Sequence, residues 1–260
     1  MPYATLKLDR EDPVAIITFN RPEKRNAIST EMIQEILAAL EEIEASPVRV
    51  TILTGAGSAF SAGMDLEGLR ALAEQSHEQN LEDSRRVATL FHRIYSFPRP
   101  LIAAVNGHAI AGGCGIATLC DFTLSVPAAK FGYTEVRIGF LPALVSVFLI
   151  RQVGEKRARD LLLTGRLVDA EEGVRLGLVT EVVPREELMP RARELAGTLV
   201  ANSPASVKGA KHLLLSISEA ELERQLAMAI DANARIRATD DFREGLSAFL
   251  EKRPPQWKSE

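Results

Sequence analysis

Short apolar runs alternate with helix-like patterns over the first two thirds of the chain. Runs rich in Val, Ile and Leu, flanked by Gly, Pro, Asn or Asp, are typical of buried strands. They cover residues 14–19, 48–53, 101–105, 122–126 and 179–183. Most are continuously apolar, as in a parallel sheet that is covered on both faces. Strands that alternate with helices in this way predict an α/β fold, with a spiral of ββα units as one arrangement.

Helical spacing predicts the remaining segments. Residues 30–45 carry apolar side chains every three or four positions, with Ser29 or Thr30 as the N-cap. Residues 67–97 are charged and have a polar centre, so two interpretations stay open: a solvated helix or a flexible wall of a pocket. Beyond residue 186 helical periodicity dominates, with breaks at 202–204 and around 239–240. We expect a core over residues 1–200 and a C-terminal helical region over 201–260, whose apolar faces pack on a partner subunit.

The composition is that of a globular protein. Of 260 residues, 46% are hydrophobic and 25% charged, and the net charge is −4. This charge argues against nucleic acid and anionic membranes as partners. The N-terminus does not resemble a secretory signal, and no apolar run is long enough to span a membrane, so we expect a cytoplasmic protein. Cys114 and Cys120 are expected to be reduced thiols. The histidines have no metal-ligand spacing, so we expect no metal site.

Two glycine-containing loops, residues 58–66 and 106–115, each follow a predicted strand. The second loop leads into an apolar stretch that is compatible with a helix. The N-terminus of a helix offers unpaired N–H groups that suit an anion or a developing oxyanion. Neither loop has the glycine patterns of nucleotide-binding sites, and the GxSxG pattern of serine hydrolases is absent.

Several motifs together make the sequence resemble the enoyl-CoA hydratase/isomerase (crotonase) family. They occur in the family's order and span nearly the whole chain. The matching stretches are residues 20–27 (NRPEKRNA), 60–65 (FSAGMD), 104–113, 120–121, 131–132 with Glu135 and Gly139, and 249–253 (FLEKR). Residues 135–146 are similar to bacterial hydratases of branched-chain catabolism, including the methylglutaconyl-CoA type.

The resemblance implies a crotonase-like spiral of ββα units with a C-terminal trimerisation region, assembled as a homotrimer or a dimer of trimers. It implies an acyl-CoA thioester as substrate and no separate cofactor, since coenzyme A is part of the substrate. In the family, two backbone N–H groups bind the thioester oxygen, and they match Met64 and Gly112. Losing one such donor typically costs about 10²–10³ in rate.

Further positions are assigned to coenzyme A or substrate by the same resemblance. The first loop lines the path of the adenine and pantetheine, and the C-terminal motif reaches the CoA of a neighbouring subunit. The residues are Arg25, Ala62, Asp65, Leu66, Gly115, Phe249 and Lys252. Asp65 and Asp121 are also interpreted as structural carboxylates that bond nearby backbone.

The catalytic carboxyl groups depart from the family pattern. Typical hydratases have two glutamates; one matches Glu135, whereas the other falls at Gly115. Read alone, Glu135 is better interpreted as a surface residue that pairs with Arg137 or Lys130; the resemblance favours catalysis, with a raised pKa in apolar surroundings. The leading hypothesis is a 2-enoyl-CoA hydratase with a single catalytic glutamate. The alternatives are a 3-enoyl-CoA to 2-enoyl-CoA isomerase, or a non-catalytic CoA-binding or RNA-binding paralogue.

Overall fold

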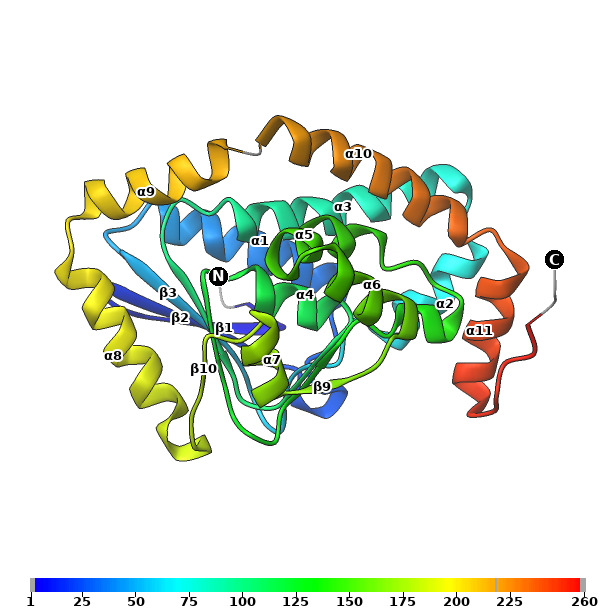
Figure 1. Ribbon diagram of the computed structural model, residues 1–260, viewed down its shortest axis with the longest axis horizontal. Helices are drawn as coiled ribbons and strands as arrows, with labels where there is room; N and C mark the ends of the chain where they lie inside the picture. Colours follow the sequence, from blue (N-terminus) through cyan, green and yellow to red (C-terminus); the bar gives the residue numbers. More distant parts are fainter. Residues whose placement is uncertain (1–2, 218, 258–260) are drawn as a thin grey trace.

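The strands lie in two sheets that follow a spiral path (Figure 1). The computed structural model describes residues 3–217 and 219–257, and of residues 66 and 67 it describes only the backbone. The larger sheet has the order β1 (Leu6–Glu11), β2 (Val14–Phe19), β3 (Val50–Gly55), β5 (Leu101–Val105), β7 (Phe122–Ser125) and β10 (Glu181–Val182). The smaller sheet has the order β4 (Ala59–Ser61), β6 (His108–Ile110), β8 (Lys130–Gly132) and β9 (Val168–Asp169).

Successive turns of the chain give one strand to each sheet. The pairs β3–β4, β5–β6 and β7–β8 do so in order, and strands of neighbouring turns pair in parallel. Helices follow each pair: α2 (Leu66–Glu74) and α3 (His77–Tyr95), then α4 (Gly112–Leu119), then α5 (Ala143–Val153) and α6 (Glu155–Thr164). This confirms the α/β class and the predicted spiral of ββα units.

The buried strands were predicted closely, and the short ones were missed. The predictions for β2 and β5 agree with the structure at both ends, whereas β3 begins two residues later than predicted. Strands β4 and β6 lie inside the segments predicted as glycine-containing loops. They have only three residues each, too few for a periodic pattern to appear. Strand β1 pairs with β2 and is mostly exposed, which explains its polar sequence.

The predicted first helix is α1 (Thr30–Glu44), and the Ser29 hydroxyl accepts a bond from the Met32 N–H as its N-cap. The uncertain segment 67–97 forms two helices. Ser76 and Gln79 make a capping box at the start of α3. The polar centre of the segment is therefore regular helix, and its Asn80 and Ser84 side chains are buried. Side chains from both helices line a cavity, which favours the pocket wall over the solvated helix.

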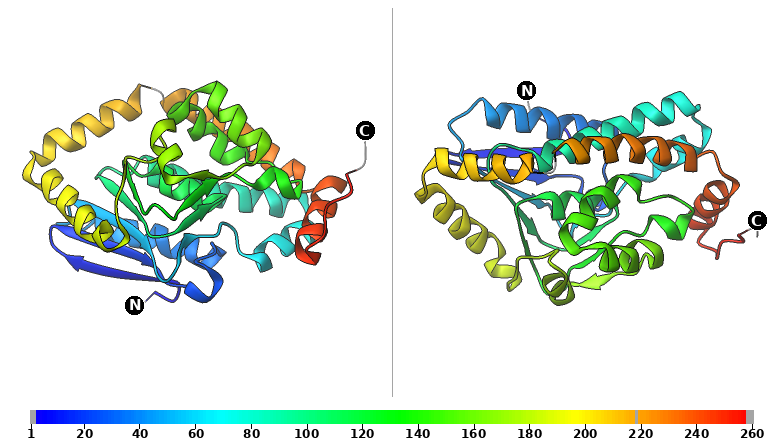
Figure 2. Two further views of the ribbon diagram at one scale, coloured as in Figure 1. Left: turned by 60° about the horizontal axis from the view of Figure 1, so that its bottom comes forward. Right: turned by 45° about the horizontal axis from the view of Figure 1, so that its top comes forward.

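After α7 (Ala170–Leu176), the C-terminal helices run around the rim of the molecule, as Figures 1 and 2 show. They are α8 (Leu188–Ala201), α9 (Pro204–Ser216), α10 (Glu219–Ile236) and α11 (Asp240–Glu251). Both predicted breaks are confirmed, with Ser203 and Thr239 as N-caps. Helix α10 packs on α3 and α5, whereas α9 has no buried residue. The division at residue 200, between α8 and α9, stays a prediction.

Both cysteine side chains are buried and free, which confirms the prediction of reduced thiols. Among the described residues, no helix combines the length and the apolar character that crossing a membrane requires.

Candidate active site

Two loops of the small sheet meet because their strands are parallel neighbours. Strand β4 pairs with β6, with Ser61 opposite Ala109. Each strand ends just before a sharp turn with positive φ, at Gly63 (φ +87°) and Ala111 (φ 49°). The turns touch: a Cβ on Gly63 would lie 3.0 Å from the Cβ of Ala111 and 3.7 Å from the nitrogen of Gly112. Met64 and Gly112, the next residue after each turn, are therefore brought together.

The N–H groups of Met64 and Gly112, the two predicted donors, take no part in the backbone hydrogen bonds around these turns. The Ile28 N–H donates to Gly63 O at 2.7 Å, and the Asp65 N–H donates to Ile28 O at 3.0 Å. Met64 lies between Gly63 and Asp65, the two residues that bond to Ile28. In such a parallel bridge its own N–H points away from Ile28. Gly112 is the first residue of α4, so its N–H has no acceptor within the helix. Both positions suit donors to a ligand oxygen.

Both loops border a cavity of about 1170 Å³. Its volume is just above the roughly 300–1,000 Å³ of typical ligand pockets. Of the predicted site residues, those that line it are Met64, Gly112, Glu135, Arg25, Ala62, Asp65 and Phe249. Gly115 and Lys252 are not part of this lining, and the side chain of Leu66 falls outside the described part of the chain.

Glu135 is a buried carboxyl group in the wall of this cavity. It begins the 3₁₀ turn η2 (Glu135–Ile138), which ends at Gly139 with φ +66°. A Cβ on Gly139 would lie 2.3 Å from the Asp241 carbonyl oxygen, so only glycine lets α11 hold this turn. No described residue pairs with Glu135 Oε2. The interpretation of Glu135 as a surface residue paired with Arg137 or Lys130 is therefore wrong, because burial separates its carboxyl from both cations.

Burial also sets the proton affinity of this group. Desolvation raises the pKa of Glu135 from 4.5 to about 7, against a smaller opposing effect of a backbone hydrogen bond. A carboxyl with this pKa exists in both protonation states near neutral pH. It can therefore take a proton from one substrate atom and deliver it to another.

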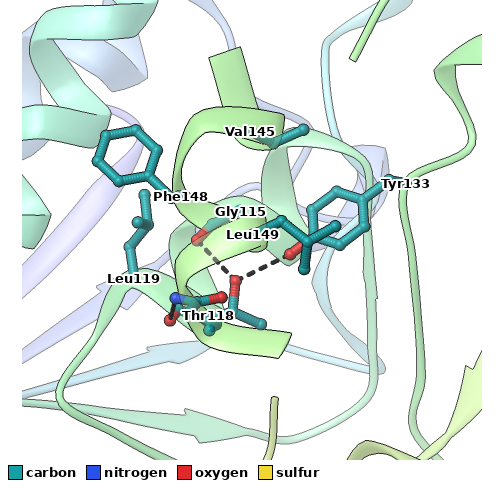
Figure 3. Close-up of a pocket in the computed structure, with 8 residues that line it drawn as sticks. Gly115, Thr118, Leu119, Tyr133, Val145, Phe148 and Leu149 are labelled. Atoms are coloured by element: carbon teal, nitrogen blue, oxygen red, sulfur yellow. Dashed lines mark hydrogen bonds between the residues drawn. The ribbon is translucent and has the colours of Figure 1, made fainter. Parts of the chain in front are cut away.

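Apolar side chains occupy the place of a second carboxyl group. A Cβ on Gly115 would lie 3.0 Å from Val145 Cγ1 and 3.2 Å from Phe91 Cζ. Both side chains line the cavity. Gly115 also lines a small hollow with no room for a water molecule, where the Thr118 hydroxyl lies 3.0 Å from the hydroxyl of Tyr133 (Figure 3). Burial raises the pKa of Tyr133 well above its ordinary value, so this phenol stays neutral and has a packing role.

Of the two predicted structural carboxylates, Asp121 bonds backbone as expected, whereas the partners of Asp65 are two cations. Asp65 lies 2.6 Å from Arg21 Nη2 and 3.7 Å from Lys24 Nζ, which fastens the first loop to the NRPEKRNA segment. Asp65 is nearly buried and lines the cavity as well. Asp121 accepts a bond from the Leu101 N–H at 2.7 Å and pairs with Lys211.

Sequence reasoning missed several residues in the wall of the cavity. Phe91 and Val145 were not assigned to the site, and Asn233 and Arg237 were not singled out. The signal for the last two was their spacing. They continue, at intervals of three and four residues, the buried stripe of α10 that contains Leu226 and Ala229.

The fold and the site together define a class of protein: a ββα spiral in which two backbone N–H groups from adjacent turns and the buried carboxyl of Glu135 border a single cavity. The model of the enoyl-CoA hydratase/isomerase family matches residues 9–260. The chain belongs to that family and is an enzyme with the chemistry of the hydro-lyases.

Relatives support this assignment over the full length of the chain. A protein of Thermus thermophilus named as a candidate enoyl-CoA hydratase is 49% identical over 94% of this chain and 97% of its own. The short-chain-enoyl-CoA hydratase of Clostridium acetobutylicum is 36% identical over 95% and 94% of the two chains. Among solved structures, an enoyl-CoA hydratase/isomerase of Xanthobacter autotrophicus Py2 superposes with a TM-score of 0.88, at 31% identity over 96% and 97%.

Proposed function

We propose that the enzyme hydrates a 2-enoyl-CoA thioester, with Glu135 as its single catalytic carboxyl group. The observation that carries the proposal is the buried carboxyl of Glu135, whose Oε2 has no partner among the described residues, in the cavity that the Met64 and Gly112 loops border. The name of the Clostridium relative, a short-chain-enoyl-CoA hydratase, supports the same reaction and a short acyl chain.

The mechanism follows from these three groups. The thioester oxygen accepts hydrogen bonds from the N–H groups of Met64 and Gly112. Ionised Glu135 takes a proton from water as the water oxygen bonds to C3, and the electrons of the C2–C3 double bond move onto the thioester oxygen. The resulting enolate is stabilised by the two donors, each worth about 10²–10³ in rate. Glu135 then returns the proton to C2 and is ionised again.

Binding of coenzyme A belongs to the same proposal. The positions Arg25, Ala62 and Leu66 border the adenine and pantetheine path, and Phe249 and Lys252 reach the CoA of a neighbouring subunit in a trimer. Asp65 holds the first loop in place through Arg21 and Lys24. The enzyme works in the cytoplasm without metal or a further cofactor.

Isomerisation of a 3-enoyl-CoA is a second candidate, because Gly115 leaves no second carboxyl. That reaction needs one base that carries a proton from C4 to C2, and Glu135 alone suffices. Hydration with a single glutamate requires the same group to act as both base and acid.

One assay separates these reactions. Incubation with crotonyl-CoA and with a 3-enoyl-CoA is followed through the absorbance of the conjugated thioester near neutral pH. We expect loss of the band with crotonyl-CoA, and a decrease of about 10²–10⁴-fold in Glu135→Gln with CoA binding retained. Gain of the band from the 3-enoyl-CoA alone would establish the isomerase. No change in either, with CoA bound, would identify a non-catalytic paralogue.

A further inference from the structure

A buried arginine lines the cavity together with Glu135. Arg237 follows the last residue of α10, and its side chain is only 1% exposed. Its Nη1 lies 2.8 Å from Asp83 Oδ2 and 3.1 Å from Asn80 Oδ1, and its Nη2 lies 2.8 Å from Asn233 Oδ1. Arginine is almost never buried unless it is paired, so this position needs an explanation.

The partners of Arg237 leave its Nε without an acceptor. A guanidinium group carries five N–H donors. Among the described residues, none accepts from Nε of Arg237, although that atom is buried. The Asn233 oxygen is shared, because Oδ1 also accepts from the Ser84 hydroxyl at 2.9 Å, and Nδ2 uses one of its two hydrogens to donate to Leu141 O at 3.2 Å. The Nε–H is therefore a buried donor without an acceptor in the described part of the chain, so the guanidinium has hydrogen-bonding capacity that its protein partners do not use.

The cluster of Arg237, Asp83 and Arg86 carries a net positive charge, and the Glu135 carboxyl lies in the same cavity wall. Asp83 is the anion in contact with it, and Arg86 Nη1 lies 3.7 Å from the same carboxylate. Both arginines and the aspartate line the cavity, so two positive charges face one negative charge. Glu82 also borders the cavity, but its side chain is 64% exposed and pairs with Arg85. An incoming anion is therefore favoured over a neutral group.

This charged group lies close to the catalytic segment. The Arg237 guanidinium is 5.4 Å from the centre of the Phe140 ring. The Phe140 N–H donates to the Glu135 carbonyl oxygen at 3.0 Å. Helix α10 runs beside α3, which supplies Asp83 and Arg86 (Figure 1). One ring therefore separates the arginine from the segment that carries the catalytic carboxyl.

We propose that Asp83, Arg86, Asn233 and Arg237 form a distal subsite that binds a carboxylate at the far end of the acyl chain. The substrate class is then the 2-enoyl-CoA thioesters of dicarboxylic acids. This inference rests on the proposed function, because it places the thioester at Met64 and Gly112 and extends the acyl chain from there toward Arg237.

Affinity for saturated acyl-CoA esters tests the subsite without turnover. Calorimetry compares pentanoyl- with glutaryl-CoA, hexanoyl- with adipyl-CoA, and octanoyl- with suberyl-CoA. At the chain length that reaches the subsite, we expect the carboxylate-ended ester to bind about tenfold more tightly or better, as for a hydrogen bond to a charged donor. Equal or weaker binding of the carboxylate-ended ester at all three lengths would overturn the proposal.

The variant is chosen so that no buried charge is left alone. Asp83→Asn combined with Arg237→Gln removes both charges of the pair, whereas removing one would leave the other uncompensated. We expect the affinity ratio of the carboxylate-ended to the methyl-ended ester to fall from about tenfold or more to below about threefold. Arg235→Gln is the matched control on the same helix, because that side chain is 71% exposed and pairs with Asp231; it should keep the preference.

A second variant covers failure of the first to fold. Arg86→Gln changes a cavity-lining side chain that is 30% exposed, and it should also reduce the preference. If both folded variants retain the full preference, the carboxylate binds elsewhere and the subsite is wrong.

Hydration of hex-2-enoyl-CoA separates the two proposals. If this methyl-ended substrate is hydrated and no carboxylate preference exists at any length, the proposed function stands and the subsite fails. If adipyl-CoA binds preferentially and no enoyl-CoA is converted, the subsite stands and the proposed function fails.

Discussion

At the scale of single residues, the carboxyl of Glu135 lowers the stability of the fold at neutral pH. The pKa of this group is about 7 in the folded chain and close to 4.5 when it is exposed. Below pH 4.5 the carboxyl is protonated in both states and has no such effect. As the pH rises toward 7 the unfolded chain releases the proton first, so the folded state loses stability by about 3 kcal/mol in total.

Glu135→Gln removes this titration. We expect the variant to be more stable than the wild type at pH 8, by up to about 3 kcal/mol, and nearly equal to it at pH 4. Urea denaturation at the two pH values measures the difference. Glu186→Gln, at an exposed glutamate, is the control and should have little effect at either pH. A Glu135 variant with the same difference from the wild type at both pH values would contradict the raised pKa.

Gly115 offers a second test at this scale. Gly115→Glu and Gly115→Gln place side chains of equal size against Phe91 and Val145, and we expect each to cost about 1–3 kcal/mol through overpacking. Only the glutamate adds a carboxyl that can share acid and base roles with Glu135. The ratio of hydration to isomerisation should therefore rise in Gly115→Glu alone. An equal ratio in the two variants would mean that position 115 does not face the acyl group.

Single residues were predictable from the sequence where a motif carried them. Met64, Gly112 and Glu135 belong to such motifs, and the structure places all three in the wall of one cavity. Arg237 was not predictable in the same way, because an arginine near the end of a helix is usually exposed. Its burial depends on Asp83, 154 positions away in the sequence, and no local pattern reveals such a pair.

At the scale of elements, the N-terminus of α4 determines one oxyanion donor. Gly112→Ala keeps the N–H, and its Cβ would lie 3.4 Å from the nearest side-chain atom, Ile28 Cδ1. Gly112→Pro introduces proline, which is tolerated at the first position of a helix, but it removes the backbone N–H. We expect a small effect of alanine on kcat and a loss of at least about 10²-fold for proline.

The measurement for these two variants is steady-state hydration of crotonyl-CoA, with CoA affinity as the control for folding. If Gly112→Pro binds CoA and turns over at the rate of Gly112→Ala, the thioester oxygen does not bind at this N–H.

Elements were predictable according to their length and burial. The apolar runs of β2 and β5 are flanked by polar or proline residues, so both of their ends could be located. The three residues of β4 and of β6 are defined by their pairing with each other, and such pairing is not visible in a local sequence. Helix α1 was predictable because its apolar spacing and its N-cap agree.

At the scale of the whole molecule, the C-terminal helices leave large apolar side chains uncovered. Leu213, Leu214 and Ile217, at the end of α9 and just beyond it, are 64–75% exposed, and Met228 of α10 is 61% exposed. Several large apolar side chains exposed on neighbouring helices are typical of an interaction site. We expect a trimer, with a light-scattering mass near three times the 28.4 kDa of one chain.

Leu214→Asp places a charge in this surface and should shift the mass toward that of one chain. Lys208→Asp, at an exposed position of the same helix, is the control and should leave the assembly intact. A mass of one chain for the wild type at micromolar concentration would refute the trimer.

The pairing of β4 with β6 has a consequence for how this enzyme tolerates changes in length. The two strands run in parallel, and the chain reaches Met64 three residues after Ser61 and Gly112 two residues after Ile110. One inserted residue would advance a donor by up to about 3.5 Å, more than the length of a hydrogen bond. We therefore expect the number of residues from β4 to Met64 and from β6 to Gly112 to tolerate no change, even where the side chains between them can be replaced.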